Sequence, residues 1–236
     1  MINKISKTYF LFFIIFIIPN QFLSQIKIDW KLDSKMENAN ISIYNEGKED
    51  IAIPLDQKSL QPYYSDNYNI SETDWLDNYP FFGLTLNIFD NVDKKNIETH
   101  LSSPNFDASK FDNLKRKTDS IKKEINLKIN SWKIKNNIND LSKAKINYYV
   151  MNNLLLLKTK EKIEFSIPFN LWNIINEYNG QLQGMYMLDK KKKNTSFLSI
   201  NIHKNIYAFI TEKQKRKLKN YKFFTGKIES NKINLQ

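Results

Sequence analysis

The sequence contains no cysteine among its 236 residues. This absence excludes disulfide bonds, thiolate metal sites, cysteine nucleophiles and a lipid attached to an N-terminal cysteine. Glycine is also scarce, and the five glycines are too widely spaced to form a phosphate-binding loop or a G-x-S-x-G nucleophile elbow. We therefore expect a fold that is stabilised by packing alone.

Histidine and arginine are equally rare. His100 and His203 are the only histidines, and no H-E-x-x-H motif is present, so the sequence predicts neither a metal site nor a cofactor. Arg116 and Arg216 are the only arginines, so lysine supplies nearly all of the positive charge behind the formal net charge of +11. Proteins usually recognise phosphates and base edges through the planar guanidinium group of arginine, which forms bidentate hydrogen bonds. A chain with two arginines is therefore poorly suited to sequence-specific nucleic-acid binding.

Residues 9–18 form an uncharged apolar run that follows Lys4 and Lys7. A helix of ten residues covers about 15 Å, which is half of a bilayer core. The run is typical of a signal peptide at 1–24, cleaved after Ser24. Cleavage leaves a mature chain 25–236 without a transmembrane span, located in the periplasm, at the cell surface or in the medium. An uncleaved anchor or a buried N-terminal helix remains the alternative.

Apolar and polar residues alternate along much of the mature chain, which predicts strands with one buried face. A turn is expected at residues 45–47, and the apolar run 154–157 suggests a central strand buried on both faces. We expect one domain over 25–236, an antiparallel Ig-like β-sandwich of eight or nine strands. The alternating apolar positions are Ile26, Ile28, Trp30, Leu32, Ile41, Ile43, Ile51, Ile53, Leu55, Leu84, Leu86, Ile88, Ile163, Phe165, Ile167, Phe169, Leu198, Ile200 and Ile202.

Helical periodicity occurs once at length, where apolar residues recur every three or four positions from Phe111 to Trp132. This spacing predicts an amphipathic helix within an insertion at about 105–146. The helix either binds a partner or, as we expect, lies across the sandwich and closes one side. Two further short helices are predicted by capping-box spacing, at Ser71 with Asp74 and at Thr211 with Gln214.

In the C-terminal strand the apolar residues switch from even to odd sequence numbers, which is a change of parity. They lie at even positions up to Ile228 and at odd positions from Ile233 onward. One strand cannot bury both sets on one face unless an extra residue shifts the register. We therefore predict a β-bulge at Ser230 and Asn231, whose side chains can satisfy unpaired backbone groups.

This ending resembles the last strand of small exported bacterial Ig-like sandwich proteins. The matching positions are Gly226, Ile228, Ser230, Asn231, Ile233 and Leu235. Residues 155–169 are similar to a strand pair of such domains, with residues 159–161 in place of the usual Pro-Gly turn. The resemblance covers about a quarter of the chain; it implies the fold and export, and it transfers no catalytic residue.

A long connection at 62–82 is rich in aromatic residues and also contains Asp66, Asp74 and Asp77. Aromatic rings beside carboxylates suit a sugar, since a ring packs against C–H groups while the acids accept hydroxyl protons. Alternatively, the rings fold back and cover one end of the sandwich. The candidate ligand-binding residues are Tyr63, Tyr64, Tyr68 and Trp75.

Two lysine-rich runs form the second candidate site. If the runs lie together, their surface attracts anionic headgroups, acidic polysaccharide or nucleic acid without sequence preference. A hairpin tip and a solvated helix face explain the same residues without a partner. The candidate anion-binding residues are Lys190, Lys191, Lys192, Lys193, Lys215 and Arg216.

The sequence favours an exported, non-enzymatic module that binds an envelope protein, a glycan or an anionic surface. The alternative is an exported hydrolase or carbohydrate-active protein that uses the aromatic connection 62–82. Acidic pairs such as Glu161 with Glu164 have no feature that distinguishes them as catalytic.

Overall fold

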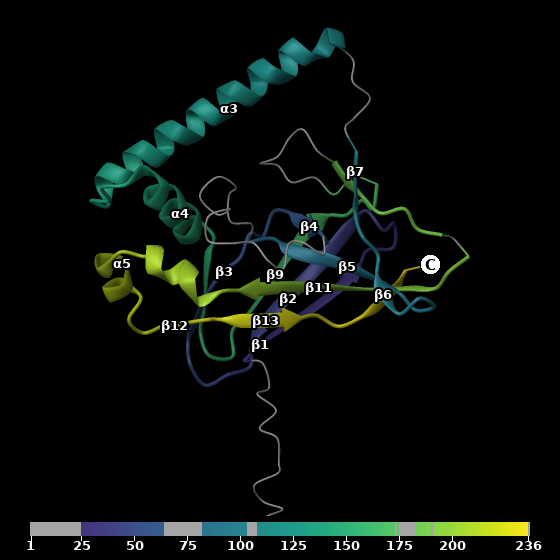
Figure 1. Cartoon of the computed structure of the whole chain (residues 1–236). Coiled ribbons are helices and arrows are strands. Elements are labelled where there is room, and N and C mark those ends of the chain that lie inside the picture. Colours follow the sequence, from purple (N-terminus) through teal and green to yellow (C-terminus); the bar gives the residue numbers. More distant parts are fainter. Residues whose placement is uncertain are drawn as a thin grey trace, which may run out of the picture.

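The computed structural model describes residues 25–63, 82–102, 108–172, 174, 183–189 and 191–235. The predicted signal segment 1–24 lies outside these residues. The described chain is mainly β, with both antiparallel and mixed sheets (Figure 1). The expected fold class is thus confirmed at the level of a mainly β protein with a helical insertion.

Sheet A is antiparallel, with the order β1-β2-β9. Its strands are β1 (Ile26–Leu32), β2 (Asn38–Asn45) and β9 (Lys162–Pro168). In β1 the buried residues Ile26, Ile28 and Trp30 alternate with more exposed ones. The period-two prediction is confirmed here, because one face of the sheet packs on the core while the other meets solvent.

Sheet C is the largest sheet and follows the order β13-β11-β5-β4, with β14 also paired to β11 and β6 to β5. Its register sets Leu198 of β11 opposite Leu86 of β5, and both are fully buried. The strands are β4 (Leu60–Pro62), β5 (Leu84–Asp90), β6 (Lys95–Asn96), β11 (Asn194–Ile202), β13 (Gly226–Glu229) and β14 (Ile233–Leu235).

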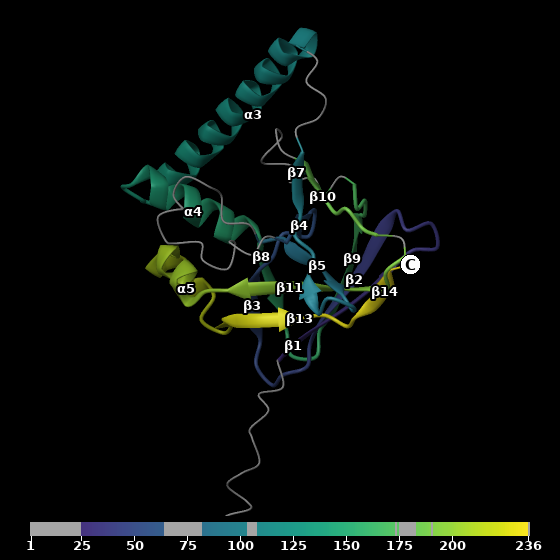
Figure 2. The same cartoon turned by 45° about the vertical axis from the view of Figure 1, so that its right-hand side comes forward.

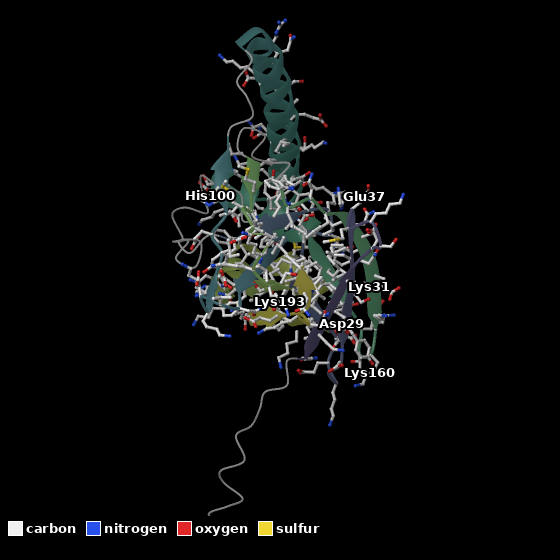
Figure 3. All side chains as sticks on the ribbon, turned by 90° about the vertical axis from the view of Figure 1, so that its right-hand side faces the viewer. Asp29, Lys31, Glu37, His100, Lys160 and Lys193 are labelled. Carbon is white, nitrogen blue, oxygen red and sulfur yellow. The ribbon has the colours of Figure 1, made fainter. Side chains whose placement is uncertain are left out.

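Sheets A and C form two layers around one hydrophobic core. In Figure 1 the strands of sheet A cross behind those of sheet C, and Figure 3 shows the two layers from the side. A single cluster of buried side chains joins Ile28 and Ile41 of sheet A with Leu86 and Ile200 of sheet C. This core supplies the packing that a chain without disulfides requires.

Sheet B has the order β12-β3-β8, from Lys222–Phe223, Ile51–Pro54 and Leu154–Leu157. The expectation that the run at β8 is a central strand is wrong: β8 lies at the edge, and Leu156 is exposed. The strand buried at every position is β3, which has a neighbour on each side. An apolar run alone does not reveal which strand has neighbours on both sides.

The expectation of a purely antiparallel fold is also wrong. β4 pairs with β5 in parallel, and β12 pairs with β3 in parallel. Residues 63–83 join β4 to β5, and this connection is long enough for the chain to return to the same end of the sheet, as a parallel pair requires. A further antiparallel pair, sheet D, consists of β7 (His100–Ser102) and β10 (Gln183–Met185).

A corner joins sheets A and B. β2 pairs with β9 and β3 pairs with β8, so the two chain segments form one antiparallel ribbon that passes from sheet A into sheet B. At the corner the fully buried Asn45 donates through Nδ2 to the carbonyls of Glu49 (2.8 Å), Lys158 (3.0 Å) and Leu157 (3.2 Å). Its Oδ1 accepts the Gly47 N–H at 3.0 Å, so the predicted turn at 45–47 is this corner.

The predicted β-bulge is confirmed at the C-terminus. Between β13 and β14, residues 230–232 stand opposite only two residues of β11, 197 and 198. The Ser230 N–H donates to the Leu198 carbonyl, and the Ser230 hydroxyl oxygen accepts the Leu198 N–H, both at 2.8 Å. The extra residue therefore changes the parity of the strand without leaving these backbone groups unpaired.

The same bulge connects the two layers. Asn231 Oδ1 accepts the Trp30 backbone N–H at 2.7 Å, and Asn231 Nδ2 donates to the Trp30 carbonyl at 3.0 Å. The Trp30 indole N–H then donates to the Asn231 carbonyl, also at 3.0 Å. These bonds attach the end of sheet C to β1 of sheet A.

The helical insertion is a hairpin of two helices, α3 (Ala108–Lys135) and α4 (Leu141–Asn152). The prediction of one long helix is confirmed, but the insertion continues beyond the expected limit of 146, because α4 runs to Asn152. In Figures 1 and 2, α3 extends outward from the sheets instead of lying across them. The expectation that it closes one side of the sandwich is therefore wrong.

Two short helices follow β11: η3 (Lys204–Phe209) and α5 (Glu212–Lys217). The Thr211 hydroxyl accepts the Gln214 N–H, and the Gln214 side chain accepts the Thr211 N–H at 2.8 Å. The capping box predicted at these two residues is confirmed, whereas Ser71 and Asp74 lie outside the described residues. It orients α5 so that Gln214 is buried against the helical hairpin.

Candidate functional site

Tyr63 is the one candidate of the aromatic set that lies among the described residues; Tyr64, Tyr68 and Trp75 lie outside them. Its carbonyl accepts the Thr99 N–H at 3.2 Å and the Thr99 hydroxyl at 2.7 Å. Its own N–H donates to the phenol oxygen of Tyr186 at 2.7 Å. The start of the aromatic connection is thus fixed to two neighbouring segments.

Tyr186 connects Tyr63 to sheet C and to the segment that contains Leu171. Its ring is buried, its phenol donates to the Leu86 carbonyl inside sheet C, and its backbone N–H donates to the Leu171 carbonyl at 2.9 Å. The residues after Leu171 and Tyr186 are Trp172 and Met187. Tyr63, Trp172 and Met187 therefore belong to three segments joined through one buried tyrosine.

Trp172 and Met187 present large apolar side chains to solvent, with 64% and 59% of their surfaces exposed. The exposed Met36 lies in the nearby β1–β2 turn, where the Glu37 carbonyl accepts the Phe169 N–H at 2.7 Å. Figure 3 labels Glu37 at this end of the molecule. We define Met36, Tyr63, Trp172 and Met187 as the aromatic end.

The backbone of the aromatic end is fixed, although its side chains are exposed. Asn170 Oδ1 accepts the Trp172 N–H at 2.9 Å, which closes a tight turn directly before the ring. β10 and β7 set Met185 opposite His100, which is exposed. Asp66, Asp74 and Asp77, the carboxylates expected beside the rings, lie outside the described residues. A rigid backbone under an exposed ring suits binding, because little order is lost when a ligand stacks on it.

Within the part of the chain that the structure describes, no three histidine or acidic side chains lie close enough together to hold a metal ion. Likewise, none of its helices is both long and apolar enough to cross a lipid bilayer.

The two lysine-rich runs are not brought together. Lys191, Lys192 and Lys193 precede β11, whereas α5 with Lys215 and Arg216 follows it; Lys190 lies outside the described residues. The nine-residue strand β11, about 30 Å long, and then η3 lie between them along the chain. Lys193 is labelled in Figure 3, at the start of β11. Anion binding by either run alone remains a prediction.

Lys192 has a structural contact of its own. Its ammonium group lies 2.8 Å from a carboxylate oxygen of Asp90 and 2.9 Å from one of Asp93. Asp90 also accepts the N–H groups of Val92 (2.8 Å) and Asp93 (3.0 Å). The hydrogen bond from Lys192, together with these N–H groups, lowers the pKa of Asp90 to about 2. Lys192 therefore stabilises the β5–β6 turn, and its charge is already paired.

On α5 the charges are partly paired as well. Lys215 contacts the Glu212 carboxylate at 2.8 Å, and Arg216 Nε donates to the Glu212 carbonyl at 3.4 Å. The hydrogen bond from Lys215 lowers the pKa of Glu212. These contacts fit the solvated helix face that the sequence offered as an alternative to a binding site.

Comparison with protein-family models, with curated proteins and with solved structures finds no match to this chain. The candidate sites are therefore defined by their own geometry.

Trp172 and Met187 are not marked as site residues by any pattern in the sequence. Each falls between strands, where no periodicity marks a residue as buried or exposed. The available signal was a tryptophan flanked by Asn170 and Asn173, shortly after Pro168 ends β9. A large ring in such a polar turn has little chance of being covered by its own neighbours.

Proposed function

We propose that the mature chain 25–236 is a single exported Ig-like β-sandwich module that binds an envelope or extracellular ligand at the aromatic end. The observation that carries this proposal is the exposed ring of Trp172, which lies on the turn closed by Asn170, one residue after the carbonyl of Leu171 that accepts the Tyr186 N–H. Exposed apolar side chains that cluster in one patch mark an interaction site. Tyr186, whose phenol oxygen accepts the Tyr63 N–H, connects this segment to the first aromatic residue of the connection 62–82.

The chemistry of the aromatic end favours a ligand with an apolar face and a polar rim. An indole ring packs on the C–H face of a sugar ring, and a flexible methionine adapts to an irregular neighbour. Backbone contacts among the three segments keep the ring in place, so binding costs little conformational entropy. An oligosaccharide of the envelope or the extracellular matrix has the required surface.

Titration of the mature chain with a panel of neutral, N-acetylated and acidic oligosaccharides tests this function. We expect tryptophan fluorescence to shift to shorter wavelength with at least one class, because the indole leaves water when it stacks. Replacing Trp172 by alanine should remove this shift and weaken binding by about tenfold or more, as loss of a central aromatic contact does.

Val92→Ala provides the matched control, because Val92 is equally exposed (67%) but lies in the β5–β6 turn. This variant should bind as the unchanged chain does. Equal affinities for Trp172→Ala and the unchanged chain, or no response to any member of the panel, would contradict the proposed site. Release of shortened sugars during the titration would instead favour the carbohydrate-active alternative.

A further inference from the structure

The helix α3 has an apolar inner face and two exposed aliphatic residues on the opposite side. On the inner face Ile129 is buried, Ile125 packs against the core, and the Trp132 ring meets Tyr148 of α4 at 5.6 Å between ring centroids. On the outer face Leu127 and Ile134 are 60% and 77% exposed. They are seven residues apart, so they lie on one stripe of the helix, about 10 Å from each other.

A third exposed aliphatic residue lies at the tip of the same hairpin. Asn137 has a positive φ of 53° and reverses the chain after α3, and Asp140 caps α4 by accepting the Lys143 N–H at 2.7 Å. The first residue of α4 is Leu141, which is 50% exposed. We define Leu127, Ile134 and Leu141 as the hairpin stripe.

Positive charge surrounds the hairpin stripe. The α3 sequence holds nine basic residues against three acidic ones, and Lys133, Lys135 and Lys143 lie near the tip. The nearby acids are Glu124, which pairs with Lys128 at 2.6 Å, and Asp140, which caps α4; between residues 123 and 143 these two acids are outnumbered by five lysines. The surface around the exposed aliphatic residues is therefore cationic.

We propose that this cationic hairpin binds the surface of an anionic lipid membrane. Aliphatic side chains enter the boundary between headgroups and acyl chains, while flanking lysines keep their ammonium groups at the phosphates. Lysine serves this purpose as well as arginine, because the attraction is to a charged surface and needs no bidentate geometry.

The combination of positive charge and exposed aliphatic residues favours a membrane over two other binding partners, a second copy of this chain and a nucleic acid. A second copy of the hairpin would place two strongly basic helices side by side, which is repulsive. Nucleic acid would attract the lysines but would leave the aliphatic residues of the hairpin stripe in water. In Figures 1 and 2, α3 projects beyond the sheets, so a flat surface can reach its outer face.

Co-sedimentation of the mature chain with vesicles tests this inference. One vesicle type contains phosphatidylcholine alone, and the other contains about one third phosphatidylglycerol. We expect binding to the anionic vesicles only, with a decrease at high salt because surface attraction is screened. The double variant Leu127→Ser/Ile134→Ser should bind about tenfold more weakly or worse, since both side chains lose their apolar burial.

Two sets of control variants test whether vesicle binding depends on the hairpin. Val92→Ser removes an equally exposed aliphatic residue elsewhere and should leave vesicle binding unchanged. Lys133→Glu/Lys135→Glu should abolish the preference for anionic vesicles, whereas Lys191→Glu, at the far lysine run, should retain it. Circular dichroism verifies that each variant is folded.

Equal binding by the double serine variant, or equal binding to neutral vesicles, would overturn the inference. Failure to bind vesicles together with salt-sensitive binding to polyglutamate would also overturn it and indicate an acidic protein partner. The test is independent of the aromatic end: Trp172→Ala should bind vesicles as the unchanged chain does, so either proposal can fail alone.

Discussion

Replacing Asn45 by alanine is expected to lower the free energy of unfolding by about 2–4 kcal/mol. The Asn45 side chain is fully buried at the corner between sheets A and B, where it donates to three backbone carbonyls and accepts one N–H. Alanine has no side-chain amide, so the carbonyls of Glu49, Leu157 and Lys158 lose the hydrogen bonds that they accept from Asn45. A buried polar group without its partner costs about 1–3 kcal/mol.

Urea unfolding of the mature chain, followed by circular dichroism, measures this effect. Asn152→Ala is the matched control, because Asn152 Nδ2 also donates to a backbone carbonyl, that of Tyr148, but on an exposed helix surface. Its stability should change by no more than about 0.5 kcal/mol. A loss below about 0.5 kcal/mol for Asn45→Ala would show that the corner does not depend on this side chain.

Replacing Asn147 by leucine is the second change with a large expected effect, again about 2–4 kcal/mol. Asn147 is fully buried on α4 and joins all the helices of the described chain. Its Oδ1 accepts the Trp132 indole N–H at 2.7 Å, and its Nδ2 donates to the Phe209 carbonyl at 2.7 Å. Gln214 of α5 exchanges two further hydrogen bonds with it, at 2.8 and 3.0 Å.

Leucine has the same number and branching of side-chain heavy atoms as asparagine, so this substitution removes the hydrogen bonds without leaving a cavity. Hydrogen exchange should accelerate at the C-terminal end of α3 and along α5, while β1 and β2 keep their protection, because the network holds the helices and not the sheets. Asn130→Ala, on the exposed face of α3, is the control and should leave exchange in α5 unchanged. Unaltered exchange in Asn147→Leu would contradict a role for the network in holding the hairpin.

The sequence predicts those parts of the fold that depend on neighbouring residues. Alternation along β1 and β2 identifies strands because one face of each is buried, and the parity change after Ile228 identifies the bulge because strand parity is strict. The capping box at Thr211 and Gln214 is likewise local. Each of these predictions needs only a few consecutive side chains.

Other features depend on contacts between distant segments, which local patterns do not record. β8 is apolar at every position, yet it lies at a sheet edge, and β4 and β5 pair in parallel through a long connection. The helix α4 buries the polar residue Asn147, which interrupts the apolar pattern that would otherwise mark its inner face.

The candidate site was less predictable than the fold. Tyr63 was identified from the aromatic content of its segment, but its link to Trp172 runs through Tyr186 and a backbone bond to Leu171. The separation of the two lysine runs likewise follows from their positions at opposite ends of β11. Tertiary structure alone decides which surface residues become neighbours.

Fractionation of cells that make the full-length chain tests the central claim of export most directly. The mass and the N-terminal sequence of the protein are read in each fraction. The account predicts a chain that begins at Gln25 and is found in the envelope or the medium, without residues 1–24. A full-length chain in the cytoplasm would contradict export, and a full-length chain held in the inner membrane would show that residues 9–18 remain as an anchor.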